Sequence, residues 1–406
     1  MSASTTIILG GGVGGLTVAN ELRQLSGPEH CVVLIERQQD YLFTPSLLWA
    51  MVGTRRVERL ARPLRALLRP GVELVHAAVT RIDPERKLVV ADGRDLNYDA
   101  LVVALGAALA PEALPGYADA AHNFFEPAGA ASFWSALQAF DGGRIVVAVS
   151  ALPYKCPAAP YEAALLVEDA LRRRRLRGRT EVVLVTPEPQ PMPVAGPALG
   201  AAVTSLLEAR GITFYPNRPL AAVDPARREL VFADGTRERF DLLAAVPPHR
   251  PPEVVRASSL ANESGWIPVD PQTLRTRAED VYAIGDVAAI ALPNGKLLPK
   301  AGVFAHAEAL VVARRIAAGR AGSRAPVFDG MGYCWVETGG GRAAFTSGDF
   351  YAKPSPRLDL RSPGAAWHLG KVLFERAWIG GGPERRLASA ALQLGARVMG
   401  IGPVSV

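Results

Sequence analysis

Cysteine is scarce in this chain. Only Cys31, Cys156 and Cys334 occur among its 406 residues. Three scattered cysteines exclude the disulfide framework of a small secreted protein and the paired-cysteine spacing of a structural zinc site, so no metal is expected. If any two of them pair, redox chemistry is the better explanation.

Long apolar runs are also missing. No stretch of 18 or more apolar residues appears, which argues against a bilayer-spanning helix. The first residues lack the pattern of a secretory signal, so we expect a cytoplasmic protein or one bound peripherally to the inner face of the plasma membrane. With 49% hydrophobic and 21% charged residues, the chain is suited to two or three domains with real cores.

Acidic residues are outnumbered by basic ones, which gives the chain a net charge of +6. Part of the excess lies in one run, "LRRRRLRGR", at residues 171–179. Such a run can bind nucleic acid or anionic lipid, but it more often forms the solvated end of a helix. We therefore expect no nucleic-acid partner.

Glycine is concentrated near the N-terminus, in "TTIILGGGVGGLTVANELRQLSGPEHCVVLIE" at residues 5–36. An apolar strand meets a G-x-G-x-x-G turn made by Gly10, Gly12 and Gly15. A helical stretch and a second strand ending in Glu36 follow. The glycines permit a tight turn, close approach of a pyrophosphate and packing of helix on strand, so the pattern predicts a dinucleotide site. Glu36 would accept hydrogen bonds from ribose hydroxyls, which disfavours NADP.

A second strand with an acid at its end occurs much later, in "VYAIGD" at residues 281–286. An acid at the carboxyl end of a strand faces the ligand crevice of an open α/β sheet. Together with the N-terminal glycines and "YDALVVALGAAL" at residues 98–109, this segment resembles the flavoproteins that have two dinucleotide-binding domains. The resemblance implies FAD, with Gly285 and Asp286 at its ribityl and pyrophosphate part.

The predicted fold class is α/β with two Rossmann-like dinucleotide-binding domains. The FAD domain is discontinuous and comprises residues 1–111 and 247–330, with the second domain, residues 112–246, inserted between them. A C-terminal α+β region, residues 331–406, carries amphipathic helices. Alternating patterns in the second domain predict strands at 144–149, 181–188, 212–217 and 242–246 and helices at 161–176 and 197–210.

The first turn of this second domain has the wrong composition for a nucleotide. NADH-using relatives carry another G-x-G-x-x-G there, whereas this chain has "SALPYKCP" at residues 150–157. The side chains and proline rings block a pyrophosphate, and proline removes an N–H donor. We therefore predict that the nicotinamide site is lost and that the electrons come from a donor other than NADH.

Within the flavoproteins, "PYKCPAAPYEAALL" at residues 153–166 resembles the sulfide:quinone oxidoreductases and the flavoprotein subunit of flavocytochrome c sulfide dehydrogenase. Four further stretches resemble the same family in the same order, at residues 40–53, 298–316, 332–351 and 367–379. The resemblance implies a redox cysteine at Cys156, beside the flavin ring, and a second one at Cys334.

The resemblance also implies a chemistry. If Cys156 and Cys334 are bonded, HS⁻ attacks one sulfur, which leaves a persulfide on that residue and a thiolate on the other that passes electrons to FAD. Glu162 is implied as an acid–base group, although it also reads as a first-turn helix acid favoured by the dipole. Two interpretations stay open for Lys300: it lies near the flavin or the quinone, or it is a solvated lysine in a loop. The cofactor contacts so implied are Gly10, Gly12, Gly14, Gly15, Glu36, Arg37, Ala78, Val79, Ala104, Gly106, Gly285, Asp286, Lys300, Ala301 and Gly302.

Some positions depart from the family. Relatives with a third redox cysteine carry it near Phe124 or Phe125, and those with covalent FAD carry a cysteine near Thr44, so we expect noncovalent FAD. His122 and His306 are candidate proton carriers, but a lone histidine is more often structural. Cys31 opens an apolar strand and is expected to pack in the core.

Quinone is the expected acceptor, and quinone resides in the bilayer. In residues 365–379 the polar residues His368, Lys371, Glu375 and Arg376 share one helical face, and a second basic amphipathic helix follows. Such helices can lie on a membrane surface, or they can pack on the protein's own core or in a homo-oligomer. Three other functions stay open: a soluble sulfide dehydrogenase that reduces a cytochrome or another protein, a type II NADH:quinone dehydrogenase and a redox sensor.

Overall fold

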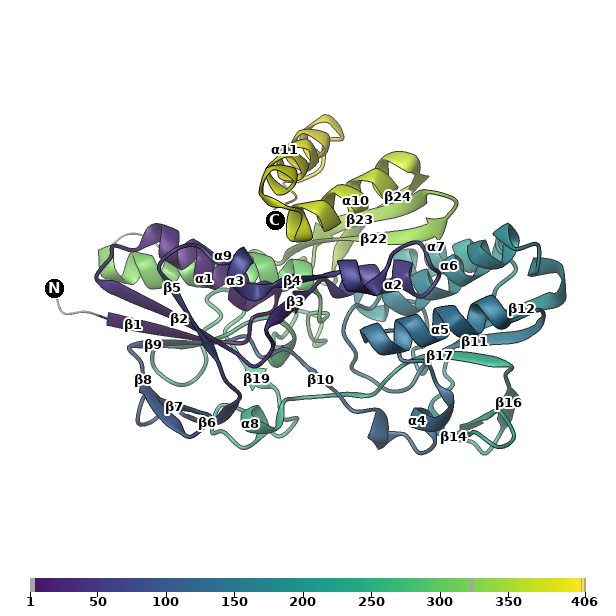
Figure 1. Cartoon of the computed structure of the whole chain (residues 1–406), viewed down its shortest axis with the longest axis horizontal. Helices are drawn as coiled ribbons and strands as arrows, with labels where there is room; N and C mark the ends of the chain where they lie inside the picture. Colours follow the sequence, from purple (N-terminus) through teal and green to yellow (C-terminus); the bar gives the residue numbers. More distant parts are fainter. Residues whose placement is uncertain (1–3, 322–324, 403, 405–406) are drawn as a thin grey trace.

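Two parallel sheets lie at the centre of the molecule (Figure 1). The computed structural model describes residues 4–321, 325–402 and 404. The first sheet has the order β20-β9-β1-β2-β5 and the second the order β13-β12-β11-β17. The first comprises β20 (Val281–Ala283), β9 (Ala100–Val103), β1 (Ser4–Leu9), β2 (His30–Glu36) and β5 (Val72–His76). The second comprises β13 (Thr213–Tyr215), β12 (Thr180–Val185), β11 (Gly143–Val149) and β17 (Leu242–Val246).

Helices cover these sheets because the central strands are apolar on both faces. The helices α1 (Val13–Leu25) and α9 (Gly302–Ala321) pack side by side against the first sheet. The second sheet is covered by α5 (Pro127–Ala139), α6 (Ala159–Arg173) and α7 (Pro197–Glu208). The side chains of β1, β2, β9 and β11 that face these helices form the buried core.

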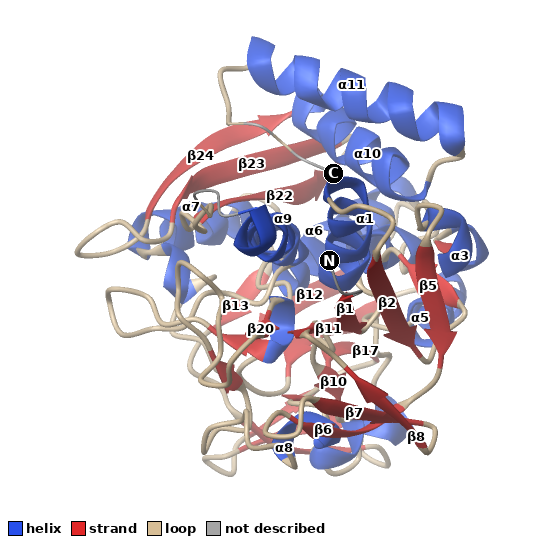
Figure 2. Ribbon diagram, turned by 90° about the vertical axis from the view of Figure 1, so that its left-hand side faces the viewer, coloured by secondary structure: helices blue, strands red, loops and turns tan. Residues whose placement is uncertain are grey.

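The C-terminal region adds a third layer above the sheets (Figure 2). It is an antiparallel sheet of β22 (Met331–Gly339), β23 (Arg342–Asp349) and β24 (Arg357–Gly364). α10 (Ala365–Ile379) packs on this sheet, and α11 (Gly382–Val398) packs on α10. β22 also contacts α6, so the C-terminal region packs against one of the helices that cover the second parallel sheet.

Smaller elements complete the fold. Two three-stranded antiparallel sheets are formed by β6 (Val79–Asp83), β7 (Leu88–Ala91) and β8 (Arg94–Asn97), and by β14 (Leu220–Asp224), β15 (Glu229–Phe232) and β16 (Arg237–Arg239). Strand pairs are β3 (Asp40–Leu42) with β4 (Ala61–Pro63), β10 (Ala108–Leu109) with β18 (His249–Arg250), and β19 (Ile267–Pro268) with β21 (Ala288–Ala289). Short helices are α2 (Leu47–Ala50), α3 (Leu64–Leu67), α4 (Tyr117–Ala120) and α8 (Glu253–Arg256).

The α/β class predicted from the sequence is confirmed, and the predicted strands and helices of the second sheet are present with shifted ends. The strand expected at 181–188 ends at Val185, which leaves Glu188 in the loop beyond it. The expectation that Cys31 packs in the core is wrong. Cys31 is exposed near the start of β2, whereas Val33 and Ile35 on the same face further along the strand are buried.

The basic run at residues 171–179 organises the end of α6. Arg172, Arg177 and Arg210 all contact the carboxylate of Glu168, which is fully buried. Arg174 donates to backbone carbonyls around the end of α5, including that of Phe140 at 3.0 Å. The run thus combines exposed arginines, as expected for a solvated helix end, with Arg174 and Arg177, which tie the end of α6 to neighbouring segments. Among the described residues, no helix is long and apolar enough to cross a bilayer.

We predict that Glu168→Gln destabilises the protein by about 3 kcal/mol, because three arginines lose their buried counter-charge. The free energy of unfolding, measured with urea, checks this. Glu253→Gln, which breaks the exposed pair between Glu253 and Arg256, is the matched control and should change the free energy little. Equal effects of the two substitutions would contradict the role assigned to Glu168.

Candidate functional site

Most of the residues predicted to hold the cofactor gather at one edge of the first sheet. Its five strands are parallel and adjacent, so their carboxyl ends share that edge. Gly10 follows β1, Glu36 ends β2, Ala104 follows β9 and Gly285 follows β20. The backbone N–H of Ala104 donates to the carbonyl of Leu9 at 2.8 Å, which extends the pairing of β1 and β9 up to the glycine turn.

The glycines of the first turn are required by geometry. Gly10 has a φ of +100°, in the left-handed region that favours glycine, and a side chain there would lie 2.5 Å from the carbonyl oxygen of Ala104. A β carbon on Gly15 would lie 1.8 Å from the carbonyl oxygen of Gly10. At Gly12, which caps the start of α1, no atom lies within 4 Å of such a carbon. A ligand can therefore approach the free N–H groups at the start of α1 through Gly12.

Glu36 lies against this turn. Its Oε2 accepts a hydrogen bond from the backbone N–H of Gly11 at 2.6 Å, and its Oε1 accepts one from Gln38 at 2.8 Å. Arg37 beside it is exposed. The carboxylate is thus fixed at the end of β2 with acceptor capacity left, because each carboxylate oxygen can accept more than one hydrogen bond.

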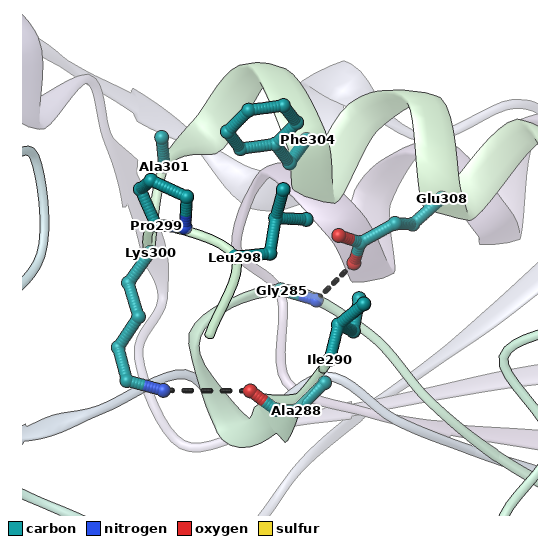
Figure 3. A pocket seen from close by; sticks show the side chains of 9 residues that line it. All are labelled: Gly285, Ala288, Ile290, Leu298, Pro299, Lys300, Ala301, Phe304 and Glu308. Carbon is teal, nitrogen blue, oxygen red and sulfur yellow. Dashed lines mark hydrogen bonds between the residues drawn. The ribbon is translucent and has the colours of Figure 1, made fainter. Parts of the chain in front are cut away.

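Gly285 and Glu308 form a contact at the other end of the edge (Figure 3). Gly285, with a φ of +70°, donates its N–H to Glu308 Oε2 at 2.6 Å. Burial raises the pKa of Glu308 to about 7. The two residues line a small cavity of about 10 Å³, a volume suited to a single water molecule.

Lys300 lines the same cavity and is buried (Figure 3). Its Nζ donates to the carbonyl oxygens of Asp286 at 2.5 Å and Ala288 at 3.4 Å, and it lies 3.5 Å from the ring centre of Trp266. Burial lowers the pKa of Lys300 to about 8. Of the two expectations for this residue, the solvated loop lysine is therefore wrong.

The remaining predicted contacts lie around this edge. Gly14 packs against Ile284, and Gly302 begins α9, with Ala301 just before it. Gly106 has a φ of +68° and open space beside it. Ala78 and Val79 follow β5 at the outer end of the edge, where the N–H of Ala78 donates to Asp92.

Cys156 sits in the turn between β11 and α6. Its φ of +57° is unusual for a residue other than glycine. Its N–H donates to the carbonyl of Lys300 at 2.7 Å, which ties the cysteine turn of the second sheet to the loop that precedes α9. The structure therefore brings the turn with the aberrant composition to the same edge as Lys300 and Asp286. In agreement with this placement, the charge of Asp286 contributes to the raised pKa of Cys156.

Cys334 lies on β22, opposite Thr346 of β23, and its thiol donates to the carbonyl of Trp335 at 3.3 Å. Both cysteines are free thiols. Burial raises the pKa of Cys156 to about 12 and that of Cys334 well above its ordinary value. Both cysteines are half-buried. α6, which follows the Cys156 turn, packs against β22, which carries Cys334, and Glu162 and Lys371 influence the pKa of both thiols.

A buried ion pair stands beside the cysteines. Glu162, in the first turn of α6, accepts hydrogen bonds from Lys371 Nζ at 2.8 and 3.0 Å and from the backbone N–H of Glu337 at 2.9 Å. Burial raises the pKa of Glu162, and Lys371 offsets part of this. Burial would lower the pKa of Lys371, but the charges of Glu162 and Glu337 raise it. Lys371 thus stays cationic and Glu162 is made more basic.

The polar face of α10 points inward. Lys371 reaches Glu162, and Glu375 is bound by Arg55 at 3.0 Å and by Ser46 at 2.6 Å. His368 contacts the buried carboxylate of Glu337 at 3.0 Å. Of the alternatives left open for this helix, packing on the protein's own core describes its polar face, because three of its four polar residues have internal partners.

The other single residues fall into structural roles. His306 contacts Thr17 Oγ1 at 3.0 Å, between α9 and α1, and burial lowers its pKa to about 4. His122 contacts Ser132, and burial lowers its pKa as well. Phe124 and Phe125, where some relatives carry cysteine, are buried, and Thr44 begins a short 3₁₀ helix.

Sequence reasoning missed several charged residues near the site. The sequence pattern predicts only that Lys371 lies on a polar helical face, and it assigns no role to Glu308. Glu308 is signalled by an isolated charge within a mostly apolar helical stretch, "AHAEALVV" at residues 305–312. A buried single charge of this kind requires an internal partner.

Known proteins resemble this chain in sequence and in fold. The mitochondrial sulfide:quinone oxidoreductase of Mus musculus is 25% identical over 377 residues, which cover 86% of this chain and 78% of that protein. The sulfide-quinone reductase of Aquifex aeolicus is 26% identical over 333 residues, which cover 77% and 76%. The X-ray structure of the sulfide:quinone oxidoreductase from that bacterium shares the fold with a TM-score of 0.85 at 23% identity, and the match covers 99% of this chain and 96% of that chain.

The resemblance predicted from the sequence is thereby confirmed. The family described as pyridine nucleotide-disulphide oxidoreductase matches residues 4–309, which is most of the chain. We conclude that this chain belongs to the pyridine nucleotide-disulphide oxidoreductase family.

Proposed function

We propose that this protein is an FAD-dependent sulfide:quinone oxidoreductase in which Cys156 and Cys334 are the redox pair. The observation that carries the proposal is the packing of β22, which carries Cys334, against α6, which follows the Cys156 turn, with the buried pair of Glu162 and Lys371 between these elements. The Cys156 turn is tied to the carboxyl edge of the first sheet through Lys300. The names of the relatives supply the substrates.

The residues at the edge fit a noncovalently bound FAD. Gly12 leaves open space at the start of α1 for a pyrophosphate, and Glu36 holds an acceptor where a ribose would lie. Asp286 and Lys300 stand at the opposite end, near Cys156. The cofactor supplies two-electron transfer between the thiols and a quinone. The contacts proposed for it are the glycines of the first turn, Glu36 and the segments at Ala104, Gly285 and Lys300.

The electron count of the sulfide step balances within the protein. In the oxidised state Cys156 and Cys334 form a disulfide. HS⁻ attacks one sulfur, so that a new S–S bond forms to sulfide as the old one breaks, and the electron pair of the old bond goes to the other cysteine as a thiolate. The sulfide sulfur is oxidised by two electrons, and the cysteine thiolate holds them.

The electrostatics suit this direction of attack. In the disulfide neither cysteine has a thiolate, so the incoming HS⁻ is the nucleophile, and the raised pKa values of both cysteines apply to the reduced state. A thiolate released in this buried place needs a counter-charge, and Lys371 lowers the pKa of both cysteines. Glu162 would then accept the proton that HS⁻ carries as sulfur bonds to sulfur, since burial makes this carboxylate more basic than usual.

The outer face of α11 offers a surface for the membrane in which quinone resides. Leu387, Leu394 and Val398 are 72, 63 and 79% exposed and fall on one side of the helix, while Leu392 packs inward. Arg397 and Arg386 are exposed on the same helix. We propose that this stripe lies on an anionic bilayer surface, which matches its combination of apolar and basic side chains.

Sulfide is expected to bleach the yellow colour of the purified holoprotein, and NADH is not. Cys156→Ser and Cys334→Ser should each retain FAD and lose bleaching by sulfide, because each removes one end of the disulfide. Absorbance near the flavin band checks both statements.

Cys31→Ser is the matched control, because Cys31 is exposed at the opposite end of β2 from Glu36, and it should behave as wild type. Bleaching by NADH would instead favour a type II NADH dehydrogenase. A single reduction without turnover on a soluble quinone would favour a sensor.

Glu162→Gln is expected to move thiolate formation at Cys156 to lower pH. Burial is the first cause of the raised pKa of Cys156 and the carboxylate of Glu162 is the second, so its removal leaves Lys371 to stabilise the thiolate. In reduced protein, the rate of Cys156 alkylation against pH, followed by mass spectrometry, should rise at lower pH. Glu375→Gln is the control, and a wild-type profile for Glu162→Gln would refute the coupling.

The double substitution Leu387→Ser and Leu394→Ser should weaken binding to anionic vesicles by at least about tenfold, since each buried leucine contributes ~1.5 kcal/mol or more. Co-sedimentation measures the binding. Leu25→Ser with Val327→Ser, at exposed positions elsewhere, is the control and should bind as wild type. If wild type does not bind vesicles, and instead forms a dimer that the double variant lacks, the membrane proposal is wrong.

A further inference from the structure

Another buried carboxylate, that of Glu188, has no part in the chemistry proposed above. It lies three residues beyond the end of β12, at the carboxyl edge of the second parallel sheet. Its Oε2 accepts hydrogen bonds from the hydroxyls of Tyr154 at 2.9 Å and Tyr161 at 2.6 Å, and the hydroxyl of Thr186 lies at 3.3 Å. Glu188 is thus a buried acceptor bound by two tyrosine hydroxyls.

The two tyrosines lie on either side of Cys156. Tyr154 precedes it by two residues, and Tyr161 directly precedes Glu162 in the first turn of α6. The hydroxyl of Tyr154 also lies 3.3 Å from the carbonyl oxygen of Pro157, on the far side of the cysteine. One carboxylate therefore holds the entry to the Cys156 turn and the start of the helix that carries Glu162.

The Cys156 turn needs such support. A non-glycine residue in the left-handed region persists only where the surroundings hold it there. The hydrogen bond from the N–H of Cys156 to the carbonyl of Lys300 provides one tie, toward the first sheet. The hydroxyls bound to Glu188 provide the other, toward the second sheet.

Glu188 occupies the position at which a dinucleotide-binding sheet carries an acid for its ligand. In a dinucleotide-binding sheet, an acid near the carboxyl end of the second strand accepts hydrogen bonds from ribose hydroxyls. β12 pairs with β11 as that second strand, and the two tyrosine hydroxyls take the hydrogen bonds that a ribose would make. Glu188, an acid at a position suited to nucleotide recognition, therefore accepts its hydrogen bonds from two tyrosines of the same chain.

We propose that Glu188 is a positioning residue: through the hydroxyls of Tyr154 and Tyr161, it holds Cys156 and Glu162 in place for the attack of sulfide. The inference rests on the function proposed above for Cys156. It assigns Glu188 no contact with the substrate or the cofactor.

Tyr154→Phe in the holoprotein tests the proposal, because it removes one hydroxyl and keeps the buried ring. We expect alkylation of the reduced Cys156 to speed up by about fivefold, the factor that corresponds to one hydrogen bond of ordinary strength, while Cys334 alkylates as before. We also expect sulfide to reduce the flavin more slowly by a similar factor.

Tyr117→Phe is the matched control. It removes another buried hydroxyl, which donates to the carbonyl of Ala245 at 2.7 Å, away from the cysteine turn. The two variants should lose comparable stability, but only Tyr154→Phe should change Cys156. Glu188→Gln, whose amide oxygen can still accept from the hydroxyls, should restore much of what Glu188→Ala loses.

Equal behaviour of Tyr154→Phe and Tyr117→Phe in alkylation of Cys156 would overturn the positioning role. If Tyr154→Phe does not fold, Tyr161→Phe removes the other hydroxyl and gives the same comparison. The alkylation rates do not depend on sulfide, so they decide this inference even if wild-type protein fails to react with sulfide, a result that would refute only the proposed function.

Discussion

The buried pair of Glu162 and Lys371 is the interaction on which the arrangement of the site depends. Glu162 comes from α6 of the second sheet and Lys371 from α10 of the C-terminal region, and the N–H of Glu337 on β22 completes the contact. Two opposite charges with few other partners are costly to bury apart, so the pair fixes how the C-terminal region docks. That docking also brings β22, which carries Cys334, against α6, which follows the Cys156 turn.

The same pair gives the site its electrostatic character. Desolvation raises the pKa of both half-buried thiols, and the charge of Lys371 lowers it. The carboxylate is more basic than usual for the same reason. Burial thus disfavours the charged form of Glu162 and of Lys371, and the attraction between their opposite charges offsets this. Groups with pKa values shifted in this way are often found at functional sites.

Much of the first sheet could be predicted from local sequence. The glycine turn and Glu36 follow a pattern set by the backbone, because Gly10 must adopt a left-handed φ and Gly15 must contact the carbonyl of Gly10. The second sheet could also be predicted from local sequence, because its strands are continuous apolar runs. The prediction for Cys31 is wrong because an apolar run does not reveal where along the strand its burial begins, and Cys31 lies near the exposed start of β2.

What the sequence determined by itself is therefore the set of strands, the dinucleotide turn and the chemical kinds of the residues at the second turn, since these depend on spacing and on allowed backbone angles. The tertiary structure alone decided that the polar face of α10 points inward, that Lys371 reaches Glu162 and that Glu188 is bound by Tyr154 and Tyr161. The physical reason is that a buried charge needs a partner, and the partner lies far away in the chain, where no local pattern specifies it.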